Sequence, residues 1–187
     1  MNLWHAFFQS LRLAFLHERQ EQAVNVPGHL NIFEYLFRDC EITEYASCIL
    51  SPDPSAKIIL SGRVDFKEVN ACGRKMPIEI KVDIDGFPAT DNVTKHGFHV
   101  HTYGDLANGC GGAGGYFNPF NVTHGAPEDR TRHIGDFGNV DVPKVGRLTT
   151  SFTDRLASLK GDQSIMGRAI VVHEGVDDLG RKQLCQS

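Results

Sequence analysis

Short runs in which apolar and polar residues alternate dominate the chain from about residue 44 onward. In Ile78-Glu-Ile-Lys-Val-Asp-Ile84 every second residue is apolar, which is typical of a strand with one buried face. Similar runs occupy 45–50, 57–69, 97–103 and 165–173, and turn-forming residues separate them. The pattern therefore predicts an all-β sandwich or barrel.

The N-terminal part of the chain has a different texture. Trp4, Phe7, Phe8, Leu11 and Phe15 recur at helical spacing, which predicts an amphipathic helix. We therefore expect a helical N-terminal extension, residues 1–43, ahead of a main domain, residues 44–187. The polar face lacks the row of Lys and Arg that membrane-surface helices use, so packing or self-association is the favoured role.

Histidines gather in and around one long loop. His99 and His101 lie two apart on a predicted strand and so point to one face of it. His124 and His133 lie in the Gly-rich segment 105–136, which is too long for an ordinary turn. Asp136 follows three residues after His133, and His173 ends an apolar run.

This pattern predicts a metal site. Neutral imidazole is a preferred ligand for copper and zinc, and a carboxylate can complete a zinc set. The isolated histidines are expected to be ordinary polar residues near the surface; they are His5, His17, His29 and His96.

Composition and charge narrow the function classes. The net charge is −4, with 19 Lys plus Arg against 23 Asp plus Glu, which argues against non-specific binding to nucleic acid. No apolar run is long enough to span a bilayer. Two glycosylation sequons, at Asn92 and Asn121, favour an extracellular location. A cytoplasmic location is the alternative, because the N-terminus makes a poor signal peptide.

Several motifs together carry a resemblance to a known family. Residues 97–105, GFHVHTYGD, closely resemble the copper-binding signature of the copper/zinc superoxide dismutases. The resemblance continues in family order through Gly109-Cys110, Phe117-Asn-Pro119, His124-Gly125, 132–140, 167–174 and 177–180. It implies a Greek-key β-barrel in which the long loop carries the zinc ligands.

The resemblance also implies roles for individual residues. His99, His101 and His173 match copper ligands, whereas His124, His133 and Asp136 match zinc ligands. Asp177 matches a carboxylate that links a copper histidine to a zinc histidine and so fixes ring orientation.

The cysteines follow the same family pattern in part. Cys110 matches a loop cysteine that the family ties to a C-terminal cysteine, for which Cys185 is the candidate. Cys48 matches a buried thiol that the family leaves out of disulfides. Whether Cys40 and Cys72 pair with each other is left open by the sequence.

Two departures from the family pattern bear on activity. Tyr116 stands where the family has a histidine that bridges both metals as an imidazolate, which tyrosine cannot do. By the resemblance, the last strand at the C-terminus is expected to be incomplete, and Lys182 matches only loosely an arginine that guides substrate. An incomplete barrel is expected to expose strand edges, which an N-terminal segment or a second subunit would cover.

We therefore expect a metal-binding protein with weak or lost dismutase activity, with zinc and copper as cofactors and with a tendency to self-associate. In outline the chain is similar to the dismutase-like proteins of mollusc haemolymph, pernin and cavortin. The alternative is an active dismutase that converts superoxide to oxygen and hydrogen peroxide.

Overall fold

The computed structural model describes residues 6–12, 41–50, 52, 58–88, 94–107, 109–142 and 146–181. For residues 6–12, only the backbone is described. Within these ranges helix is confined to two short elements, α2 (Cys110–Ala113) and the 3-10 helix Gly161–Gln163. None of the helices described is long and apolar enough to cross a membrane.

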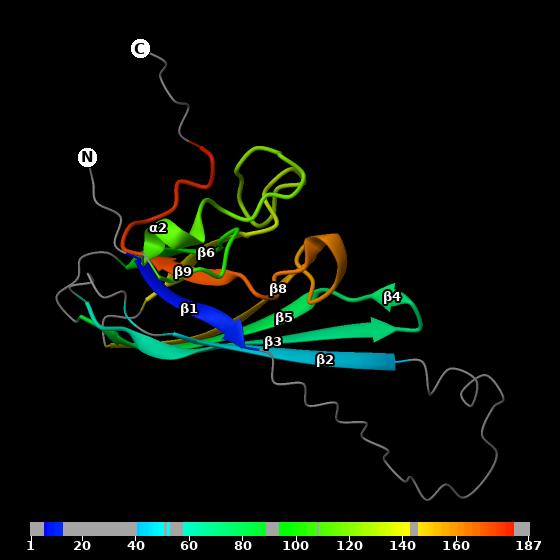
Figure 1. Cartoon of the computed structure of the whole chain (residues 1–187), viewed down its shortest axis with the longest axis horizontal. Coiled ribbons are helices and arrows are strands. Elements are labelled where there is room, and N and C mark those ends of the chain that lie inside the picture. The colour runs from blue at the N-terminus through cyan, green and yellow to red at the C-terminus, as the bar shows by residue number, and fades with distance from the viewer. Residues whose placement is uncertain are drawn as a thin grey trace, which may run out of the picture.

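The rest of the regular structure is antiparallel β-sheet, as predicted. The strands pair in the order β7-β6-β9-β1-β2-β3-β5-β8, with β4 on β3, and Figure 1 shows them stacked in two layers. Neighbours that are distant in sequence, such as β5 with β8 and β6 with β9, require the crossovers of a Greek-key fold. The strands are β1 (Ala6–Arg12), β2 (Glu41–Leu50), β3 (Ser61–Ala71), β4 (Arg74–Lys75), β5 (Ile78–Phe87), β6 (Lys95–Val100), β7 (Asp136–Asp141), β8 (Gly146–Asp154) and β9 (Ala169–His173).

Alternation along the strands builds one core between the layers. On β5, Ile78, Ile80, Val82 and Ile84 are buried, while the residues between them face outward. Phe66 on β3 and Phe98 on β6 fill the same interior from opposite layers. Burial of this apolar surface is the main favourable term for the fold.

The N-terminal strand β1 differs from expectation. Residues 6–12 form a strand rather than the predicted helix, and they pair with both β9 and β2. Ala6 lies opposite His173 at one end of β1, and Arg12 lies opposite Ser47 at the other. Short apolar runs fit either period, and here the backbone groups of two neighbouring strands select the extended form.

This pairing joins the two layers through β1, which lies between β9 and β2 in Figure 1. The other residues of the expected helical extension lie outside the described ranges, except for the start of β2 at Glu41. Residues 182–187 also lie outside them, so the incomplete C-terminal strand stays a prediction.

A register shift between β6 and β7 brings the end of the long loop, residues 105–136, next to His99 on β6. The register shifts between Gly97 and His99, so that His99 lies opposite Asp136. An isolated bridge pairs His101 with Tyr116. Bulges of this kind re-aim side chains next to functional sites.

Candidate metal centre

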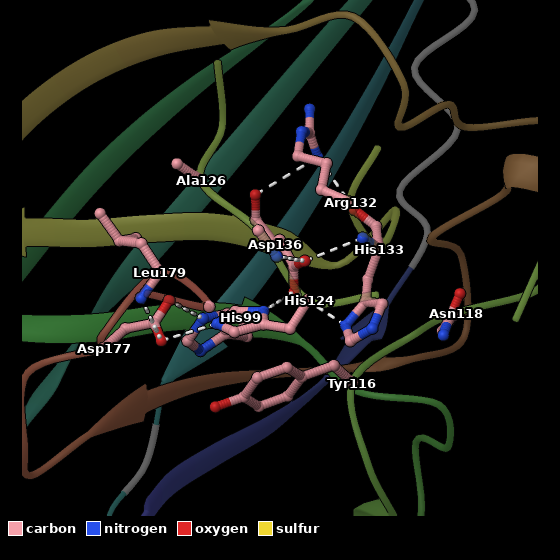
Figure 2. Close-up of polar contacts among 12 residues, drawn as sticks. His99, Tyr116, Asn118, His124, Ala126, Arg132, His133, Asp136, Asp177 and Leu179 are labelled. Atoms are coloured by element: carbon pink, nitrogen blue, oxygen red, sulfur yellow. Dashed lines mark hydrogen bonds and ion pairs between the residues drawn. The ribbon is translucent and has the colours of Figure 1, made fainter. Parts of the chain in front are cut away.

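The long loop folds around the buried carboxylate of Asp136. Its Oδ2 accepts hydrogen bonds from the backbone N–H groups of Gly125 (3.1 Å) and His133 (2.8 Å). Its Oδ1 lies 3.0 Å from Nδ1 of His124 and 3.1 Å from Nδ1 of His133. The structure thus brings together the three residues predicted to bind zinc (Figure 2).

The hydrogen bonds of the two rings fix which nitrogen is available. His124 donates from Nε2 to Asp177 Oδ1 at 2.8 Å, and His133 donates from Nε2 to the carbonyl of Val122 at 3.1 Å. Both Nδ1 atoms then carry lone pairs. They face Asp136 Oδ1, and these three buried atoms have no hydrogen-bond partner. Three electron-rich atoms at close range suit a cation, and this donor set suits zinc.

The charge environment agrees with this arrangement. Burial lowers the pKa of His124, but the hydrogen bond to Asp177 and the charge of Asp136 outweigh it, and the net pKa is raised. The set of His124, His133 and Asp136, which we call the loop group, therefore attracts positive charge.

A second group contains the three histidines predicted to bind copper. The ring of His173 lies 4.8 Å from that of His99 and 5.4 Å from that of His101, between centroids. His101 donates from Nδ1 to the carbonyl of Gly114 at 2.7 Å, so its Nε2 carries a lone pair, 3.4 Å from Nε2 of His173. His99 donates from Nε2 to Asp177 Oδ2 at 3.0 Å, and its buried Nδ1 has no hydrogen-bond partner.

Burial keeps His101 and His173 in their metal-binding form. Desolvation, first among the causes, lowers the pKa of His101 to about 4 and that of His173 to about 3. Both rings are thus neutral at pH 7, and neutral imidazole is the form that binds copper. The donors present therefore fit both metals.

Asp177 connects the two groups. Burial raises the pKa of this carboxyl, but hydrogen bonds from His99 and His124 hold it well below its usual range. Asp177, His99 and His124 also lie close enough together to hold an ion. However, their Nε2 atoms donate to the carboxylate, so we assign Asp177 to orienting the rings.

Tyr116 lies between the groups at the position where the resemblance expects a bridge. Its ring stacks on His99, with centroids 4.0 Å apart and an interplanar angle of 12°. Figure 2 shows the hydroxyl at the end of the ring far from His133. Burial, and then the charges of Asp177 and Asp136, raise the pKa of Tyr116, so the phenol stays protonated at neutral pH.

The structure describes some of the other residues singled out from the sequence but not all of them. Asn121 is exposed, and Cys110 begins α2. Cys48 is a buried thiol, as expected from the resemblance. Asn92, Cys40, Lys182 and Cys185 lie outside the described residues.

Sequence reasoning missed three residues around the centre. His96, expected near the surface, is buried, with Nδ1 2.8 Å from the carbonyl of His173. Arg132 donates to the carbonyls of His133 and Asp136, and Asn139 bonds to the backbone of Asp177. Arg132 and Asn139 fall within the matched motif 132–140, but that motif gives no sign of these contacts.

Comparisons with known proteins agree with the geometry. A family model described as copper/zinc superoxide dismutase matches residues 60–187. An extracellular superoxide dismutase [Cu-Zn] of Caenorhabditis elegans is 44% identical over 68% of this chain and 54% of its own length. Its counterpart in Haemonchus contortus is 54% identical over 46% of this chain and 47% of its own. The chain thus spans about half the length of these two relatives.

Two further matches cover more of their own chains. Superoxide dismutase [Cu-Zn] 5 of Dictyostelium discoideum is 42% identical over 73% of this chain and 82% of its own length. A crystal structure of the clock protein EA4 superposes with a TM-score of 0.63 at 34% identity, and covers 75% of this chain and 81% of its own.

Proposed function

Because the chain belongs to the copper/zinc superoxide dismutase family, we propose that it is a dismutase-like protein that binds zinc and copper and has weak or lost dismutase activity. The observation that carries this proposal is the phenol of Tyr116, stacked on His99 between the two ligand groups. The corresponding residue of the family, by the resemblance, is an imidazolate that bonds both metals. Tyr116 has no ring nitrogen, so it cannot take that place.

Each set of ligands acts separately in this proposal. His124, His133 and Asp136 would hold zinc through Nδ1, Nδ1 and Oδ1, the atoms that face one another. His99, His101 and His173 would hold copper, which supplies one-electron chemistry when bound. Residue 116 has no nitrogen that could accept a proton and link the two sets of ligands. We therefore expect the rate of dismutation to be low.

The alternative is an active dismutase that converts superoxide to oxygen and hydrogen peroxide. The six residues that match the family's non-bridging ligands are present in the sequence, and three relatives bear the name superoxide dismutase. In this alternative Lys182 would assist in guiding the anionic substrate.

Location and assembly are further parts of the proposal. Two of the relatives are named extracellular dismutases, and exposed Asn121 offers a sequon, so we place the protein outside the cell, glycosylated at Asn92 and Asn121. An oxidising location suits a Cys110–Cys185 disulfide. We also propose that the protein self-associates. The proposed domain division remains an N-terminal extension, residues 1–43, and a main domain, residues 44–187, but β1 of the extension forms part of the barrel.

Cys40 and Cys72 form a second proposed disulfide. Glu41 pairs with Ala71 in the β2–β3 register, and Cys40 and Cys72 are the residues next to this pair in the sequence. We infer the disulfide from this adjacency.

The decisive experiment measures metal content and superoxide decay on the same reconstituted sample. We expect both metals to bind, with a second-order rate constant far below the diffusional ceiling of about 10⁹ M⁻¹s⁻¹. A value near that ceiling would establish the alternative. Failure to bind either metal would refute both functions.

Tyr116→His then tests the missing bridge. This variant should raise copper occupancy and dismutase activity, whereas Tyr116→Phe, which keeps the ring but adds no nitrogen, should change neither. If Tyr116→His gains nothing, the absent bridge is not what limits activity.

A further inference from the structure

The side chain of Asn139 on β7 holds the backbone of Asp177 from both of its polar groups. Asn139 Nδ2 donates to the carbonyl of Asp177 at 3.0 Å, and Asn139 Oδ1 accepts from the Asp177 N–H at 2.8 Å. The two residues are 38 positions apart in sequence. Across β6, Asn139 pairs with Gly97, whose N–H donates to the carbonyl of Gly175 at 2.9 Å. The segment before Asp177 is therefore fixed to two adjacent strands.

The position of Asp177 controls two rings at once. Its side chain is only 6% exposed; Oδ2 accepts from His99 and Oδ1 from His124. Each bond uses Nε2–H, and so leaves Nδ1 of each ring with its lone pair toward a metal. A displacement of the Asp177 backbone would therefore turn both rings.

From this geometry we propose that Asn139 is a positioning residue that couples the two metal groups through Asp177. The inference rests on the proposed function, because it assumes that both groups bind metal. With Tyr116 at the bridging position, Asp177 bonds one histidine of each group. Asn139 thus sets the affinity for copper and for zinc together.

Asn118 provides a matched comparison within the same molecule. It makes the same pair of bonds to Val122, with Nδ2 donating to the carbonyl at 2.8 Å and Oδ1 accepting from the N–H at 3.1 Å. The Val122 carbonyl then accepts from Nε2 of His133 at 3.1 Å. Asn118 therefore reaches a histidine of the loop group alone.

The test compares Asn139→Ala with Asn118→Ala in the full chain. Zinc and copper affinities are measured separately by titration against chromophoric chelators. Asn139→Ala should lower both affinities by about tenfold, the lower end of the effect of outer ligand partners. Asn118→Ala should lower the zinc affinity and leave the copper affinity unchanged. A loss confined to one metal in Asn139→Ala would overturn the coupling.

A second readout does not require metal. In the metal-free protein, ¹⁵N NMR reports which nitrogen of His99 and His124 carries the proton. Asn139→Ala should shift the signals of both rings, and Asn118→Ala should shift neither. Unchanged rings and affinities despite a lower melting temperature would show that Asn139 only supports the fold, and would overturn the proposal.

The near-isosteric Asn139→Asp, which loses the donor to Asp177, gives the same test if the alanine variant does not fold. If the wild-type protein binds neither metal, the proposed function fails, and the NMR comparison still decides whether Asn139 positions both rings.

Discussion

Arg132 forms a buried ion pair with Asp154 and thereby joins the loop that carries His124 and His133 to the end of β8. Their side chains are 2% and 3% exposed. The same guanidinium donates to the carbonyls of His133 (3.0 Å) and Asp136 (3.3 Å). The pair therefore connects the stability of the barrel to the geometry of the loop group.

Replacing Arg132 should lower both the free energy of unfolding and the affinity for zinc. Arg132→Met leaves Asp154 buried without its cation, and should lower the free energy of unfolding by about 3–5 kcal/mol. Denaturant unfolding measures this, and a zinc titration of the same variant should show weaker binding. Arg147→Met, which breaks an exposed pair with Asp83, is the control and should change the midpoint little. Equal effects of the two variants would contradict the assigned role.

Metal removal should destabilise the protein, because the lone pairs of His124, His133 and Asp136 converge without a hydrogen-bond partner. Zinc at 100 times its Kd should stabilise the fold by about 2.7 kcal/mol. Thermal unfolding with zinc and with a chelator measures the difference. His133→Ala, which keeps the backbone bond to Asp136, should abolish most of it. An unchanged response in that variant would place the zinc elsewhere.

Cys48 should make stability fall at high pH. Burial raises the pKa of this thiol from 9.0 to about 12 in the folded protein. Because the pKa is higher in the folded protein, the stabilisation by the protonated thiol is fully present below the ordinary pKa of 9.0 and is lost as the pH rises through about 12. Between these limits unfolding releases a proton, and stability should fall by about 1.4 kcal/mol per pH unit from this group.

Cys48→Ala separates this effect from other titrations. The variant should be less stable at neutral pH because of the cavity, yet its stability should decline less steeply above pH 9. Parallel curves for the two proteins would show that the thiol is not the group responsible. Native Cys48 should also resist alkylation at pH 8, since only the thiolate reacts.

The N-terminal strand should be needed for a closed barrel. Deletion of residues 1–12 removes the strand between β9 and β2 and exposes the edges of both, which promotes association. We expect a lower melting temperature and larger species in light scattering. Gln9→Pro, which removes one backbone donor, should act in the same direction but less. A deletion variant with the same particle size and the same melting temperature as the full chain would refute this role for β1.

Periodicity predicted β2, β3, β5, β6 and β9, but it predicted neither β7 nor β8. In β5 the alternation of Ile78, Ile80, Val82 and Ile84 matches the observed burial, because local pattern and tertiary environment agree. It failed for residues 6–12, where the conformation depends on β9, a strand more than 150 residues away. No local signal carries that information.

In the candidate site, too, some residues could be predicted from the sequence and others could not. His99, His101 and His124 were identifiable from residue type and family motif. Asn139 and His96 contact backbone atoms distant in sequence, Asn139 through two hydrogen bonds and His96 through one. Such bonds leave no spacing or composition pattern, and only the folded structure reveals them.

The pairing of β1 with β9 also sets the order of events during synthesis. Ala6 leaves the ribosome more than 150 residues before its partner His173. Until β9 emerges, the apolar N-terminal segment lacks that partner, and closing so long a loop is slow. The barrel can therefore close only after β9 has left the ribosome, and strand edges that are exposed before closure favour misassembly.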